Sequence, residues 1–200
     1  MDDRLKTASR LKNWIACNYT TINEINKKGL KKKESSTTED IRKKRGDEFE
    51  EKIYKKLIKQ YPKHIKIKKD DDRFEKTKEA LKKGYDLIHK AHFKHKGWVG
   101  EIDFLIKDQN KKSKNGKWKY EVYDTKLSSI AKTDHITQIS LYSEWIATQQ
   151  DNELPDFMYL ILGIKDKEKK VNILKIDEEI KQYKTKNYQL YFKNNEANYI

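Results

Sequence analysis

The sequence predicts an α/β domain whose helices cover the faces of a mixed β-sheet, and three observations support this fold class. Residues 38–62 place apolar side chains at helical spacing. Residues 85–126 then contain three strand-like segments in succession. An amphipathic segment and a nearly continuous apolar run follow, as expected for a surface helix and a buried strand. The resulting order of helix, three strands, helix and strand is typical of helices packed on a sheet.

Turn and breaker residues set the boundaries of the first elements. The long helix ends at Pro62, and Gly84 ends a charged helix over residues 70–83. Between them, residues 64–68 alternate polar and apolar side chains, as a short half-exposed strand does. The three following strands are expected at 85–95, 97–107 and 118–126, with a turn at 94–97 and a longer solvated turn at 108–116.

The remaining elements complete the sheet and close the domain. The amphipathic helix is expected at 133–150, and the buried strand follows Pro155 at 157–164. One more strand is expected at 171–176, followed by a closing helix at 177–192.

The N-terminal part differs in character from the rest. Residues 1–38 mix short apolar stretches with a connector rich in lysine, serine and threonine, which indicates a helical extension with a mobile link. The folded domain is therefore expected to span residues 39–200.

Composition limits the partners and the compartment. The 200 residues include 46 Lys and Arg against 32 Asp and Glu, for a net charge of +14. This surplus favours nucleic acid over a membrane surface, although a lysine-rich composition bias is an alternative source of the charge. No apolar run approaches a spanning helix, no signal peptide is recognisable, and Cys17 is the one cysteine, which excludes an all-cysteine iron–sulfur cluster within the chain. We therefore expect an intracellular protein, cytoplasmic or nuclear.

Two adjacent strands carry the candidate chemistry. Asp124 and Lys126 lie two residues apart on a predicted strand, so they point the same way, roughly 6 to 7 Å apart along the strand. Asp103 is embedded among apolar residues of the preceding strand, where a carboxylate needs a partner or a cation. Two carboxylates and a lysine on neighbouring strands indicate a divalent-metal phosphodiesterase. An ordinary surface ion pair is the alternative interpretation of Asp124 and Lys126.

The order and spacing of six blocks resemble the PD-(D/E)XK nuclease superfamily, and within it a RecB-like group of predicted nucleases. The resemblance covers about residues 40–165 and implies a restriction-endonuclease-like core with the order α-β-β-β-α-β. The blocks lie at residues 45–50, 83–88, 100–105, 120–127, 138–143 and 160–163.

The resemblance also implies roles for individual residues. Asp103, Asp124 and the Thr125 backbone carbonyl would bind Mg²⁺ or Mn²⁺ through oxygen, with Lys126 beside the attacking water. The implied roles of three other residues are less direct. Gln138 would position Lys126, the water or a phosphate, Tyr142 would lie on the same side of the helix, and Glu50 would bind metal directly or through water.

Two positions depart from the family. Phe49 stands where a histidine is common, which removes a nitrogen ligand. Glu101 replaces a usual arginine and is expected either to help hold a cation or to pair with a neighbouring lysine. The five histidines show no metal-ligand spacing on a common helix, and His89 is expected to be packed or solvated.

We therefore expect a metal-dependent nuclease, with an exonuclease-like activity and DNA rather than RNA as its substrate. One alternative is a catalytically silent nucleic-acid-binding or assembly module, or a fragment that works with a helicase or another protein partner; Phe49 is the feature that favours it. Another alternative is a ribonuclease.

Overall fold

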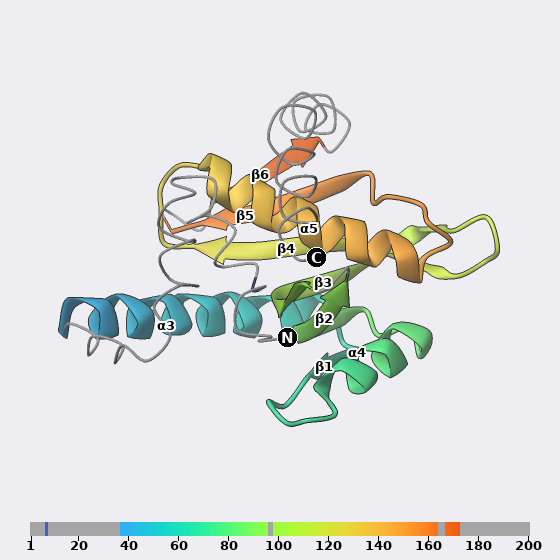
Figure 1. Ribbon diagram of the computed structural model, residues 1–200, viewed down its shortest axis with the longest axis horizontal. Helices are drawn as coiled ribbons and strands as arrows, with labels where there is room; N and C mark the ends of the chain where they lie inside the picture. The colour runs from blue at the N-terminus through green and yellow to red at the C-terminus, as the bar shows by residue number, and fades with distance from the viewer. Residues whose placement is uncertain (1–6, 8–36, 96–97, 164–166, 173–200) are drawn as a thin grey trace, which may run out of the picture.

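The computed structural model describes Thr7 and residues 37–95, 98–163 and 167–172, the last range by its backbone alone. Six strands form one sheet in the order β1-β2-β3-β4-β5-β6, so each strand lies beside the next one along the chain (Figure 1). The elements are α3 (Thr37–Gln60), β1 (His64–Lys66), α4 (Arg73–Lys82), β2 (Leu87–His95), β3 (Trp98–Lys112), β4 (Trp118–Lys126), α5 (Thr133–Gln149), β5 (Phe157–Leu162) and β6 (Lys167–Asn172).

The sheet is mixed, as the sequence predicts. Strands β2, β3 and β4 pair antiparallel, and so do β5 and β6. The pairs β1–β2 and β4–β5 are parallel. Parallel neighbours need a crossover connection, and the helices α4 and α5 provide the two crossovers.

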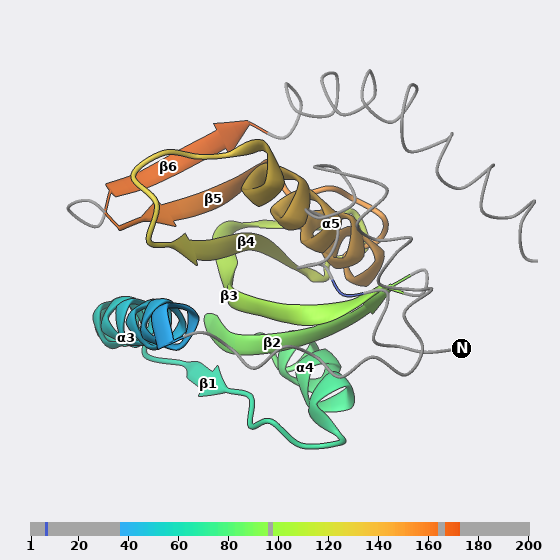
Figure 2. The same cartoon turned by 60° about the vertical axis from the view of Figure 1, so that its left-hand side comes forward.

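The helices cover both faces of the sheet, and each face has its own apolar core (Figure 2). Helices α4 and α5 pack on one face, where Trp145 is 1% exposed and contacts Phe93 and Phe74 through their rings. Helix α3 packs on the opposite face through Phe49 and Ile53. We name these the α5-side core and the α3-side core.

A glycine ends α4, as predicted. Gly84 has a φ of +63°, its N–H donates to Leu81 O, and the Tyr85 N–H donates to Ala80 O. This pair of bonds is the Schellman arrangement, which satisfies the last helical carbonyls. A Cβ at Gly84 would lie 2.4 Å from Trp118 Nε1, so the close approach of the Trp118 side chain also favours glycine.

One predicted connection is wrong. The long solvated turn expected at 108–116 does not form, because β3 continues to Lys112 and only a short turn with Gly116 at φ +78° follows. The last residues of β3 are exposed, so their polar side chains are compatible with a strand that extends into solvent.

The other boundaries agree within a few residues, apart from β6, which begins at Lys167 rather than at residue 171. The remainder of that predicted strand, the helix at 177–192 and nearly all of the extension at 1–38 lie outside the described residues. Within the described ranges, no helix combines the length and apolar character needed to cross a membrane.

Candidate active site

The two predicted carboxylates lie on neighbouring central strands. Phe104 of β3 is opposite Tyr123 of β4, and the strands are antiparallel. Asp103, which precedes Phe104, is therefore opposite Asp124, which follows Tyr123. Asp103 Oδ2 accepts hydrogen bonds from the Thr125 backbone N–H and from the Thr125 hydroxyl, both at 2.7 Å. The hairpin register therefore fixes the Asp103 carboxylate beside the residue that follows Asp124.

Lys126 lies on the same side of β4 as Asp124, as strand alternation predicts. Its Nζ is 2.6 Å from Asp124 Oδ2 and donates a 3.1 Å hydrogen bond to Gln138 Oε1 on α5. Gln138 Nε2 in turn donates to the Tyr142 hydroxyl at 2.7 Å. Tyr142 is buried in the α5-side core, so this series of contacts ties the lysine ammonium to a packed helix.

The alternation of side chains is interrupted where β2 and β3 pass this region. Ile102 and Leu105 belong to the same α5-side core although they are three residues apart. Asp103 lies between them. The same interruption occurs in β2 around Lys90, whose φ is 61°, and the register places the two interruptions opposite each other. A strand irregularity of this kind redirects side chains near a site.

The acidic groups and the lysine shift one another's pKa values. Burial raises the pKa of Asp103 to about 8, and the charges of Asp124 and Glu50 add to the shift. Burial also raises the pKa of Asp124, against the opposing effect of Lys126. Burial alone would lower the pKa of Lys126, but Asp124 and Asp103 outweigh it and raise that pKa. Repulsion among these carboxylates favours a bound cation.

Asp103 and Asp124 fit a hard divalent cation. Asp124 Oδ2 is buried and lies 2.6 Å from Lys126 Nζ, so a cation bound at Asp124 would share this carboxylate with the lysine. Among the described residues, no three His, Cys, Asp or Glu side chains form a ready-made metal cluster. Mg²⁺ commonly binds one or two carboxylates with waters and substrate phosphates, so two carboxylates are sufficient. The Thr125 carbonyl stays a predicted further ligand.

Glu50 reaches the same region from α3. Its side chain is 9% exposed, with Oε1 2.7 Å from His89 Nε2 and Oε2 2.6 Å from Lys90 Nζ. Burial raises the pKa of Glu50, but the bonds to His89 and Lys90 outweigh it and leave the pKa below its usual value. Both carboxylate oxygens are therefore already engaged by nitrogen atoms.

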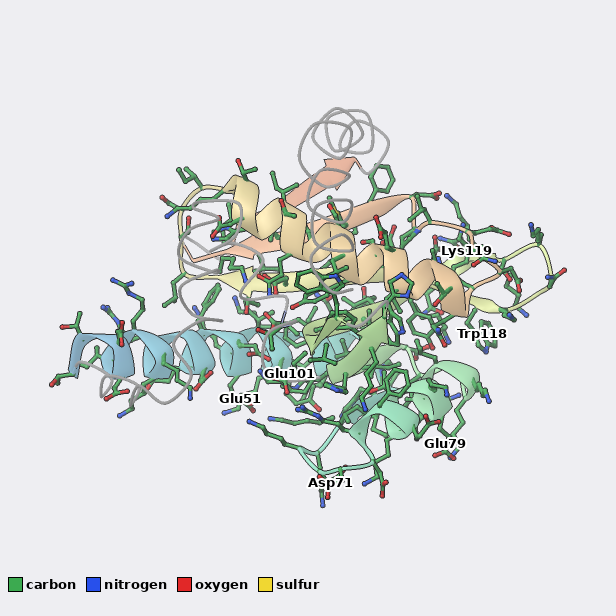
Figure 3. All side chains as sticks on the ribbon, in the orientation of Figure 1. Glu51, Asp71, Glu79, Glu101, Trp118 and Lys119 are labelled. Carbon is green, nitrogen blue, oxygen red and sulfur yellow. The ribbon has the colours of Figure 1, made fainter. Side chains whose placement is uncertain are left out.

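The structure shows the neighbours of Phe49 and Glu101, the two positions that differ from the nuclease pattern that the sequence resembles. Phe49 is buried in the α3-side core, next to Glu50 in sequence, so its ring serves packing. Glu101 Oε1 lies 3.1 Å from Lys90 Nζ, and Glu101 Oε2 lies 3.8 Å from Arg73. Figure 3 shows Glu101 beside one end of α3, with Trp118 on the other side of the view. Of the two expectations for Glu101, the geometry matches the salt bridge.

Sequence reasoning did not identify His89 and Lys90 as site residues. His89 is 1% exposed and packed, one of the two expectations for it, with its ring 4.1 Å from that of Tyr54 and 5.0 Å from that of Phe104. The available signal was the apolar spacing Ile88, Ala91 and Phe93, which breaks strict alternation around Lys90.

Comparison with known proteins adds no assignment. No family model matches the sequence, and no match was found among curated proteins.

Proposed function

We propose that the protein is a Mg²⁺- or Mn²⁺-dependent nuclease with a restriction-endonuclease-like core, which hydrolyses phosphodiester bonds in DNA. One observation carries the proposal. Asp103, Asp124 and Lys126 converge from two paired strands, and Gln138 of the following helix contacts the lysine. This constellation is the one that the PD-(D/E)XK resemblance implies.

The topology supports the proposal. The chain order α3, β2, β3, β4, α5 and β5 follows the order α-β-β-β-α-β that the resemblance implies. The strands β2, β3 and β4 form antiparallel hairpins, and α5 crosses to a parallel β5. The additional elements β1, α4 and β6 lie at or beside the edges of this core.

The carboxylates would hold the cation, and it would supply Lewis-acid charge that acidifies a water and offsets phosphate charge. Asp103 and Asp124 would bind it, and Thr125 restricts the Asp103 side chain through two hydrogen bonds. In the hydrolysis, the water gives up a proton to solvent as its oxygen bonds to phosphorus, the bond to the leaving sugar oxygen breaks, and that oxygen takes up a proton from solvent.

Lys126 would stabilise the negative charge that develops on the phosphate oxygens. Its ammonium contacts Asp124 and is directed by the Gln138 amide oxygen, whose own amide nitrogen donates to Tyr142. This orientation is set before substrate binds, which is the condition under which an electrostatic contribution to catalysis is largest.

Helix α3 offers a surface for the phosphate backbone. It carries Glu50 toward the site, and its last turns present four exposed lysines with no acidic residue between the first and the last. Lysines on a helix bind phosphates without reading sequence. These lysines are Lys52, Lys55, Lys56 and Lys59.

A cleavage assay tests the proposal. End-labelled single- and double-stranded DNA and RNA are incubated with purified protein in Mg²⁺, Mn²⁺ or EDTA, beside Asp124→Asn and Lys126→Ala. Matched controls are Asp86→Asn, whose carboxylate pairs with Lys107, and Lys119→Ala, which removes a largely buried ion-paired lysine elsewhere on β4. Cleavage that needs metal, fails in both site variants and persists in both controls supports the nuclease. RNA-only cleavage would change the substrate to RNA.

A second candidate function is a silent nucleic-acid-binding module. Phe49 occupies a packed core position in place of the family's usual histidine, and both Glu50 oxygens are engaged by His89 and Lys90. In the same assay, salt-sensitive binding without cleavage in either metal would favour this candidate.

A further inference from the structure

A second lysine, Lys90, lies among the site carboxylates. Its Nζ is 2.6 Å from Glu50 Oε2 and 3.1 Å from Glu101 Oε1. The three groups come from three different elements, β2, α3 and β3, and the Lys90 side chain is 26% exposed. The acidic neighbours outweigh burial and raise the pKa of Lys90, and Asp103 is among them. The ammonium therefore stays charged beside the carboxylates of Glu50 and Glu101.

The backbone of Lys90 adopts a conformation that side chains other than glycine rarely take. Its φ is 61°, in the left-handed region. Such a conformation is strained for a residue with a Cβ. It falls at the interruption of β2 that the register places opposite Asp103. The strained residue is thus the one whose ammonium contacts Glu50 and Glu101.

The same contacts determine how many divalent ions the region can hold. Two-metal sites place ions roughly 3.5 to 4 Å apart, and a second ion here would need ligand oxygens beyond those of Asp103 and Asp124. Lys90 occupies one oxygen of Glu50 and one of Glu101, and His89 occupies the other Glu50 oxygen. A second divalent ion on this side of Asp103 would have to displace the ammonium.

We propose that the site binds a single divalent cation, at Asp103 and Asp124, and that the Lys90 ammonium takes the place of a second one. This inference rests on the proposed nuclease function and specifies its metal requirement. Glu50 and Glu101 then act as positioning residues that hold Lys90 rather than as direct ligands. Lys126 and Lys90 supply positive charge through different carboxylates, Asp124 in one case and Glu50 with Glu101 in the other.

Counting bound Mn²⁺ tests the proposal without any cleavage. Free Mn²⁺ is measured by electron paramagnetic resonance during titration of the metal-free protein. The wild type should bind one ion, and Asp124→Asn should lose it. Lys90→Met should bind two ions because it releases Glu50 and Glu101, whereas Lys90→Arg keeps the charge and should still bind one.

Lys107→Met is the matched control, since it removes a buried lysine that pairs with Asp86 at 2.5 Å outside the site. It should bind one ion. Lys90→Gly removes the same ammonium and also relieves the left-handed backbone, so it replaces Lys90→Met if that variant does not fold.

The outcomes separate the two proposals. Two ions on the wild type, or one ion on the Lys90→Met and Lys90→Gly variants, would overturn the single-ion inference and leave the nuclease proposal intact. If the wild type binds no Mn²⁺, the metal-dependent function fails, and the inference fails with it.

Discussion

The raised pKa of Asp103 predicts a specific pH dependence of stability in the metal-free protein. Burial, Asp124 and Glu50 raise this pKa from its ordinary 3.8 to about 8 in the folded state. Between these two values the folded protein binds a proton that the unfolded chain has released, so the free energy of unfolding falls as pH rises. The slope for one proton is about 1.4 kcal/mol per pH unit.

Asp103→Asn removes this titration and keeps an oxygen that can accept the two hydrogen bonds from Thr125. Relative to the variant, the wild type should therefore lose about 2 kcal/mol of stability between about pH 6.0 and about pH 7.5. Histidines and surface groups titrate in both proteins, so their effects cancel in the difference.

The assay is urea unfolding in EDTA at the two pH values, followed by fluorescence of the buried Trp98 and Trp145. With saturating Mg²⁺ the pH-dependent loss should diminish, because the cation takes over the role of the proton. Parallel stability curves for wild type and Asp103→Asn across this pH range would refute the reasoning, since they would show that Asp103 ionises normally in the folded protein.

Three further predictions concern binding, chemistry and the fold. Lys126→Ala should bind DNA nearly as tightly as wild type in a filter assay yet cleave far more slowly, whereas Lys119→Ala should bind and cleave like wild type; a proportional loss of binding and cleavage in Lys126→Ala would mean that Lys126 only contacts a phosphate. Wild-type binding should weaken steeply between low and moderate salt, and a flat response would contradict a backbone-binding role. Gly84→Ala should destabilise by about 1 to 3 kcal/mol in urea unfolding, because its Cβ would lie 2.4 Å from Trp118 Nε1 at a φ of +63°. Gly46→Ala, with nothing within 4 Å of its Cβ, should instead stabilise α3 by about 0.5 to 1 kcal/mol, and equal effects would contradict the steric argument.

The parts of the fold that follow local rules are predictable from sequence. Pro62 and Gly84 end helices for backbone reasons, and the apolar spacing in α5 matches the face that it buries. The end of β3 is different, because its polar residues 109–112 read as a loop. Lys112 pairs with Trp118 of β4 after a register shift that follows Lys107, and that pairing depends on tertiary contacts rather than on composition.

The candidate site divides in the same way. The alternation of β4 predicts that Asp124 and Lys126 share a face, and the structure brings them to 2.6 Å. Glu50 meets His89 and Lys90 because α3 packs across β2, and this packing brings together partners that are 39 and 40 positions apart in the chain. Lys90 also adopts a left-handed φ, for which the broken alternation of Ile88, Ala91 and Phe93 is the signal in the sequence.

The most direct test of the central claim is the single-turnover rate of DNA cleavage in Mg²⁺ for wild type, Asp124→Asn and the control Asp86→Asn. We predict cleavage by the wild type and the control, and a loss on the order of 100-fold or more in Asp124→Asn, as expected when about 3 kcal/mol of transition-state stabilisation disappears. Cleavage by Asp124→Asn at the wild-type rate would show that the activity comes from somewhere other than this pair of strands.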